Sequence, residues 1–261
     1  MPRTIRATRY VTPLREGGSL PGLVEADDDG LYVLKFRGAA QGPRVLVAEL
    51  LAGEIGRALG LPVPEIVFIE LDPALGAAEP DSEVRELIGR SGGLNLGMDF
   101  LPGALPFRPG AGFVPDAGLA ASVVWFDALV TNPDRTTHNP NILVWHRRPW
   151  LIDHGASFYV HYTWRDAAEH ARRPFERIRD HAWLPYAAPI AEADERLAPQ
   201  LTPGLLDSIV ALLPDEWLAD DALSHRHAGS PEDQRQAYRD YLARRLSSPR
   251  PFVPEAVSAR S

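Results

Sequence analysis

The sequence predicts an α+β protein in which strands dominate the first hundred residues and helices dominate the rest. Residues 3–11, 31–37 and 61–71 are apolar runs with β-branched or aromatic side chains, which is the pattern of strands. After residue 158 the apolar spacing becomes mostly helical. With 261 residues, the chain is long enough for one large domain or for two lobes.

The composition excludes several classes of protein. No apolar run approaches the roughly 20 residues that a membrane-spanning helix needs. The chain has no cysteine, which rules out disulfides and thiolate metal sites, and its first residues lack the apolar core of a secretory signal. A net charge of −8 argues against general nucleic-acid binding. We therefore expect a cytoplasmic protein without membrane insertion.

Lysine usage singles out one position. Of the 27 basic residues, only Lys35 is a lysine, so the other 26 (27 − 1) are arginines. Lys35 lies in the strand pattern YVLKF. A position that keeps lysine in an arginine-rich chain is one where a compact ammonium group matters. We therefore predict that Lys35 binds phosphate groups.

A helix is expected to follow this strand, over residues 43–60. Its apolar positions recur every four residues, and Gly60 ends it. Glu49 and Glu54 lie on this helix about 140° apart, so only one of them can face Lys35. Glu49, 14 residues after Lys35 (49 − 35), is the preferred partner, and Glu54 is the alternative.

Residues 15–30 read as a turn that contains a second candidate for phosphate binding. Gly17 and Gly18 are followed by Ser19, so that backbone N–H groups and a hydroxyl could approach a phosphate closely. The alternative is a simple hairpin turn without a ligand.

Residues 92–104 are glycine-rich around a short apolar strand, and we expect them to connect the two lobes. Their backbone groups could also meet the edge of a purine base. The stretch from Gly97 through Met98 and Asp99 to Phe100 is the expected contact.

The polar positions that carry the chemistry lie between residues 126 and 158. Asp134 opens a loop that Asn139 closes, and Asp153 follows two short apolar stretches and precedes a glycine by two positions. Buried aspartates are costly unless they are paired or bind a cation, and Asp and Asn oxygens suit Mg²⁺. This spacing is the catalytic-loop and metal-loop arrangement of kinases. Asn141, just before the apolar run, is the alternative to Asn139.

Phosphoryl transfer assigns a role to each of these residues. Lys35, positioned by Glu49, would hold the phosphates of ATP. Asp134 would orient and deprotonate an acceptor hydroxyl. Asn139 and Asp153 would hold Mg²⁺. Arg135 is interpreted either as offsetting charge near the loop or as forming a structural salt bridge.

Several of these motifs together resemble those of the HipA-like kinases and, more distantly, the phosphatidylinositol 3-/4-kinase fold. The N-x-D-R-x-x-x-N loop and the I-D-x-G loop match position by position in FDALVTNPDRTTHNPNIL and LIDHGASF. YVLKF with its upstream GGS turn, the AELL helix followed by GLPVP, and FLPGA match the family's order. The resemblance covers roughly residues 15–160.

The resemblance implies a bilobal protein-kinase-like fold that uses ATP and Mg²⁺. It implies a small β-rich N-lobe with one main helix (residues 1–96) and a larger, mostly helical C-lobe (residues 97–261). It also implies transfer of the γ-phosphate to a hydroxyl, of Ser or Thr in a protein or of a small molecule. The chain is shorter than full-length HipA toxins, and we expect it to lack their extra N-terminal subdomain. The tail from Ser247 is expected to be frayed.

Three other interpretations stay open. The first is a nucleotide-binding sensor of the pseudokinase type, and the second is nucleotidyl transfer with the nucleotide reversed. The third is a metal-dependent hydrolase, because four histidines cluster in sequence around the same carboxylates: His138, His146, His154 and His161.

Overall fold

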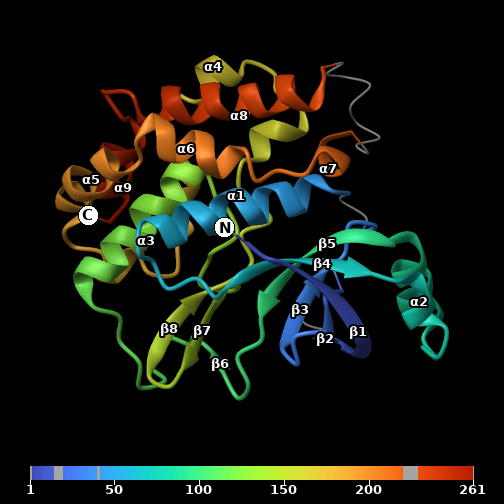
Figure 1. Ribbon diagram of the computed structural model, residues 1–261. Helices are drawn as coiled ribbons and strands as arrows, with labels where there is room; N and C mark the ends of the chain where they lie inside the picture. Colours follow the sequence, from blue (N-terminus) through green and yellow to red (C-terminus); the bar gives the residue numbers. More distant parts are fainter. Residues whose placement is uncertain (1, 15–19, 40–41, 220–228, 261) are drawn as a thin grey trace.

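The computed structural model describes residues 2–14, 20–39, 42–219 and 229–260 (Figure 1). The turn predicted at Gly17, Gly18 and Ser19 lies outside the described residues. The α+β class is confirmed: a β-barrel forms from the first hundred residues, and most helices follow it.

The barrel closes in the strand order β1-β2-β3-β5-β4. All neighbouring pairs are antiparallel except β1 and β4. Its interior is filled by side chains that alternate along the strands, such as Val24, Leu34 and Ile69. The strands are β1 (Thr4–Pro13), β2 (Gly22–Ala26), β3 (Leu31–Lys35), β4 (Ile66–Leu71) and β5 (Gly93–Asp99).

Strand β2 corrects the sequence analysis, which assigned residues 15–30 to a turn. Its burial alternates strictly, with Val24 completely buried between β1 and β3. The lobe boundary expected between residues 96 and 97 stays a prediction. Both residues lie within β5, which pairs with β3 as far as Asp99 and with β4 as far as Met98.

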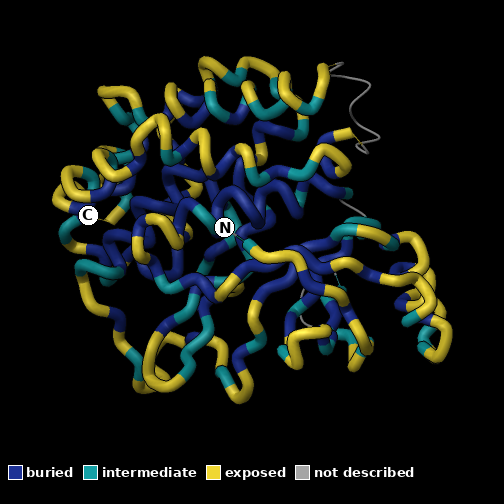
Figure 2. The backbone as a smooth tube through the Cα atoms, in the orientation of Figure 1, coloured by how far each residue is buried: buried dark blue, intermediate teal, exposed yellow. Residues whose placement is uncertain are grey.

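Helix α1 (Arg44–Ala58) is the central element of the molecule. It contacts β4 and β5 of the barrel as well as α6 (Pro203–Val210) and α7 (Asp215–Ala219). Because it is covered on several sides, its buried positions run almost continuously, and Figure 2 shows its backbone within the buried interior. Glu49 on this helix is completely buried, which requires a charged partner.

The remaining elements build the rest of the molecule around α3 (Ala117–Val130). This helix is buried along nearly its whole length. Three further strands form a second sheet in the order β6-β7-β8. Along the chain, β6 precedes the predicted catalytic loop, and β7 and β8 follow it. The strands are β6 (Leu105–Pro106), β7 (Ile142–Trp145) and β8 (Arg148–Leu151). The other α-helices are α2 (Ser82–Arg90), α4 (Ala167–His170), α5 (Ile190–Leu197), α8 (Pro231–Leu246) and α9 (Phe252–Arg260).

Short 3-10 helices connect these elements: η1 (Pro73–Gly76), η2 (Tyr159–Tyr162), η3 (Glu176–Asp180), η4 (Leu184–Tyr186) and η5 (Ala198–Gln200). Among the described helices, none is long and apolar enough to cross a bilayer.

The expectation of a frayed tail from Ser247 is wrong. Helix α9 ends the described chain, and it buries Phe252 and Ala256. The Phe252 ring packs against Trp125 of α3 with 6.0 Å between ring centroids. The Arg245 guanidinium lies 4.7 Å from the centroid of the same ring. Packing against Trp125, which lies 127 positions earlier in the chain (252 − 125), thus holds the C-terminal helix in place.

Candidate active site

The predicted lysine–glutamate pair is present. Lys35 is the last residue of β3, and its Nζ lies 2.5 Å from Glu49 Oε2 on α1. The same Nζ lies 2.6 Å from Asp153 Oδ1, so the one ammonium group joins the barrel, α1 and the loop after β8. The alternative partner, Glu54, pairs instead with Arg57 on its own helix, at 3.3 Å.

Burial and charge oppose each other in this cluster. Burial lowers the pKa of the Lys35 ammonium, but Asp153 and Glu49 outweigh burial and hold that pKa above its usual value. Burial likewise raises the pKa of the Glu49 carboxyl, while the Lys35 charge and a hydrogen bond with His154 hold it well below its usual range. Both groups are therefore ionised at neutral pH.

The loop after β8 presents Asp153 to solvent and to Lys35 at once. The Asp153 side chain is 42% exposed. Its backbone is left-handed, with φ of 56°, which is uncommon for a residue other than glycine. Gly155 follows where a Cβ atom would come within 2.6 Å of Val45 on α1, so the loop lies tightly against that helix. We call residues 153–155 the metal loop.

The catalytic loop gathers the other predicted residues. Asp134 Oδ2 accepts hydrogen bonds from the side-chain amides of Asn139, at 2.9 Å, and Asn141, at 3.0 Å. Asn132 Oδ1 accepts from the backbone N–H of Asp134. Neither Asn139 Oδ1 nor Asn141 Oδ1 accepts a hydrogen bond from any residue that the structure describes, so both amide oxygens are available to a ligand.

A buried ion pair beneath the loop settles the role of Arg135. Its Nε donates to Asp127 Oδ2 on α3 at 2.6 Å, and both side chains are completely buried. His181 Nε2 lies 2.9 Å from the same oxygen. Burial raises the pKa of Asp127, but Arg135 and His181 outweigh burial and hold it well below its usual range. Arg135 is thus a structural residue that anchors the catalytic loop to α3.

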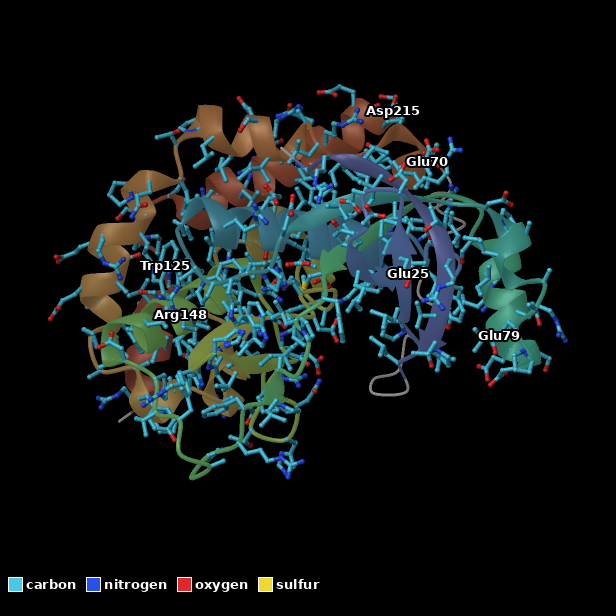
Figure 3. The ribbon with its side chains drawn as sticks, turned by 60° about the horizontal axis from the view of Figure 1, so that its bottom comes forward. Glu25, Glu70, Glu79, Trp125, Arg148 and Asp215 are labelled. Atoms are coloured by element: carbon cyan, nitrogen blue, oxygen red, sulfur yellow. The ribbon has the colours of Figure 1, made fainter. Side chains whose placement is uncertain are left out.

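A cavity of about 520 Å³ lies between the barrel and the β7–β8 hairpin. Figure 3 labels Glu25 on strand β2 of the barrel and Arg148 on strand β8 of the hairpin. Its lining brings together five of the predicted residues: Lys35, Met98, Asp99, Phe100 and Asp153. The volume falls in the range of small-molecule sites.

Two residues near the site, Leu101 and His154, were not predicted from the sequence. Leu101 is buried and lines the cavity next to Phe100, and no described residue accepts a hydrogen bond from its backbone N–H. His154 contacts Glu49 from the metal loop. Extending by one residue the stretch that is expected to meet a purine would have included Leu101, whereas no spacing rule pairs His154 with a residue 105 positions earlier.

The histidines give no support to a hydrolase. His154 and His161 are buried and contact Glu49 and Tyr238, while His138 and His146 are exposed. In the described part of the chain, no three His, Asp or Glu side chains gather in a way that could hold a metal ion by themselves.

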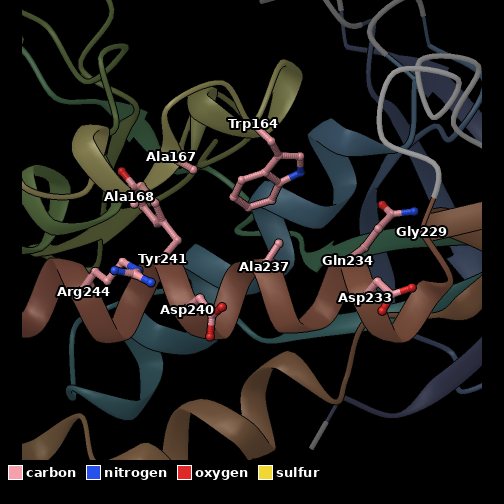
Figure 4. Close-up of a pocket in the computed structure, with 10 residues that line it drawn as sticks. All are labelled: Trp164, Ala167, Ala168, Gly229, Asp233, Gln234, Ala237, Asp240, Tyr241 and Arg244. Atoms are coloured by element: carbon pink, nitrogen blue, oxygen red, sulfur yellow. The ribbon is translucent and has the colours of Figure 1, made fainter.

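A second cavity, of about 460 Å³, lies along α8 (Figure 4). Trp164, Ala237, Tyr241 and Arg244 line it, and none of the predicted site residues does. It is therefore separate from the candidate active site.

Comparisons with known proteins identify the family and the fold. The sequence pattern of HipA-like kinases matches residues 8–245. The fold is similar to that of the Helicobacter pylori proinflammatory kinase CtkA, with a TM-score of 0.60 and 12% identity over 98% of both chains. It is also similar to the Golgi casein kinase with Mn/ADP bound, with a TM-score of 0.52 and 12% identity over 98% of this chain and 74% of that one. None of the curated proteins compared with the chain matches it in sequence. The chain belongs to the family of HipA-like kinases.

Proposed function

We propose that this protein is a bilobal kinase that transfers the γ-phosphate of ATP, with Mg²⁺, to a serine or threonine hydroxyl of a protein. The observation that carries the proposal is the position of Lys35, whose Nζ is shared by Glu49 and Asp153 beside a cavity of nucleotide size. An ammonium group fixed between two carboxylates cannot swing away, so it stays where phosphates can reach it.

The cavity offers a donor suited to adenine. The backbone N–H of Asp99 donates to Glu65 O at 2.9 Å, and that of Phe100 donates to Leu31 O at 3.0 Å. The next N–H, on Leu101, has no acceptor among the described residues and would be available to a base. Adenine presents an acceptor at N1, whereas guanine presents a donor there, so this N–H favours ATP over GTP.

The residues also fit Mg²⁺. Asp153 contributes a half-exposed carboxylate, and Asn139 contributes an amide oxygen without a partner among the described residues. Asn141 offers the same group and is the alternative ligand. These are hard oxygen ligands of the kind that Mg²⁺ prefers, and too few to bind it without phosphate oxygens. When bound, Mg²⁺ would neutralise charge on the phosphates.

In this proposal, Asp134 acts as the base. Asn139 and Asn141 both bind Oδ2, and no described residue donates to Oδ1. Oδ1 of Asp134 would therefore take up the proton of the substrate hydroxyl while the oxygen of that hydroxyl forms a bond to the γ-phosphorus. The bond between that phosphorus and the β–γ bridging oxygen breaks, and ADP leaves with the electron pair.

Parallel incubations with α-labelled and γ-labelled ATP and a mixed protein substrate would test this proposal. We expect label to reach protein from γ-labelled ATP only, and only with Mg²⁺ present. Label from α-labelled ATP would show nucleotidyl transfer instead. Nucleotide binding without transfer of either label would show a sensor.

A further inference from the structure

His154 contacts Glu49 on the side that Lys35 leaves free. Its ring is completely buried, and its Nδ1 lies 3.3 Å from Glu49 Oε1. Lys35 binds the other oxygen, Oε2, at 2.5 Å. The two oxygens of one buried carboxylate are thus held by two different elements, the end of β3 and the metal loop.

The chemistry of the two groups fixes the direction of this hydrogen bond. An ionised carboxylate can only accept, so His154 Nδ1 carries the hydrogen and donates it. The other ring nitrogen, Nε2, is buried and has no partner among the described residues. The ring otherwise packs edge-on against Phe126, with centroids 5.9 Å apart. Donation from Nδ1 to Glu49 is therefore the only polar interaction of this imidazole in the described structure.

The neighbours of His154 show why this contact matters. Asp153 is held in a left-handed conformation, which costs free energy unless the surroundings impose it. On the other side, Gly155 lies against α1, where a Cβ atom would also come within 3.5 Å of Glu49 Oε2. His154 is thus the side chain that ties the strained backbone at Asp153 to α1.

We propose that His154 is a positioning residue, which couples the metal loop to α1 so that Glu49, Lys35 and Asp153 take up their arrangement together. This inference rests on the proposed function, because it assumes that Asp153 binds Mg²⁺. Loss of the Nδ1 donor would leave Glu49 Oε1 buried without a partner and would release the metal loop from α1.

Three replacements of His154 distinguish the effect of its hydrogen-bond donor from the effect of its ring shape. In His154→Asn, the amide nitrogen lies as many bonds from Cα as Nδ1 does. In His154→Gln it lies one bond further, and His154→Phe keeps the ring without any donor. Partners that orient a metal ligand are typically worth about 10- to 100-fold in metal affinity. We therefore expect the Gln and Phe variants to lose about that much Mg²⁺ affinity, and the Asn variant to stay within about threefold of the parent.

Calorimetric titration of Mg²⁺ into each protein with saturating ADP measures this directly. The matched control is His161→Phe: His161 is also buried, with Nδ1 2.8 Å from Tyr238 OH, but it contacts no residue of the site. Its Mg²⁺ affinity should equal that of the parent. Equal affinities in parent and His154→Gln, or an Asn variant as weak as the Gln variant, would overturn the inference. A parent whose ADP complex takes up no Mg²⁺ would instead refute the proposed function, and this inference with it.

Discussion

Lys35 is the residue on which the site depends most directly. Its side chain is only 10% exposed, and its Nζ lies within 2.6 Å of an oxygen of each carboxylate. A single ammonium nitrogen can approach two oxygens at once in this narrow space. A guanidinium group spreads its charge over a planar fork that is considerably wider.

The variant Lys35→Arg should therefore weaken the use of ATP although it keeps the charge. We expect the KM for ATP to rise about tenfold or more, which corresponds to about 1.4 kcal/mol. Steady-state kinetics would measure it. The reverse exchange, Arg173→Lys, is the control, because the Arg173 side chain is exposed and, among the described residues, forms an ion pair with Glu169 alone. An unchanged KM and kcat in Lys35→Arg would remove Lys35 from the phosphate-binding site.

Individual site residues could be predicted from the sequence where a residue type was scarce or where the spacing along a helix was fixed. Lys35 stood out as the single lysine, and helical geometry separated Glu49 from Glu54. His154 and Leu101 could not be predicted in the same way. His154 was not predicted because its contact with Glu49 joins two segments that are distant in sequence. Leu101 was not predicted because the sequence does not show which neighbouring backbone N–H groups form hydrogen bonds in the fold.

At the scale of secondary structure, long periodic patterns were predicted correctly, and short ones next to turn residues were not. The helix expected over residues 43–60 is α1, and only its ends differ. Strand β2 was missed because glycine, proline and three consecutive aspartates surround it, and its pairing with β1 and β3 outweighs those signals.

Helix α9 shows the same limit at the other end of the chain. Prolines at 251 and 254 suggest a disordered tail, but both lie where a helix tolerates proline, just before it and in its first turn. Burial of Phe252 against Trp125 then stabilises a helix that local sequence alone does not predict. Tertiary packing, and not local sequence, determines that helix α9 forms.

In the molecule as a whole, contacts with helix α7 fix the position of the barrel relative to the helices. Trp217 of α7 donates from Nε1 to Leu94 O on β5 at 2.9 Å, and its ring packs against Phe68 of β4. Arg37, just after β3, pairs with Glu216 at 2.5 Å. The Lys35 cluster joins the barrel to α1 and to the loop after β8, so a second, separate set of contacts also holds the barrel to the rest of the molecule.

The pH dependence of stability is also a property of the whole molecule. Burial, with a smaller contribution from Arg44, lowers the pKa of His161 to about 3, and burial lowers the pKa of His181 despite Asp127. The unfolded chain takes up these protons near pH 6.5, whereas the folded protein does not. The free energy of unfolding should therefore fall as the pH drops below about 6.5.

The expected loss at His161 is about 1.4 kcal/mol between pH 7.5 and 5.5. Urea unfolding at the two pH values would measure it, and in His161→Phe the loss should be smaller by about that amount. Below about pH 4.5, protonation of unfolded carboxylates adds a further loss, because Asp127 and Glu49 have lowered pKa values when folded. A stability that is constant between pH 7.5 and 5.5 would contradict the buried, neutral state of these histidines.

The most direct test of the proposed chemistry is the transfer of γ-label by Asp134→Asn, measured together with its affinity for ATP. If Asp134 is the base, the variant keeps the shape and loses the proton acceptor. Transfer should then fall by about 10²- to 10⁴-fold, while nucleotide affinity and melting temperature stay close to those of the parent. An Asp134→Asn protein that transfers label at the rate of the parent would contradict the assignment of this site as a kinase active site with Asp134 as its base.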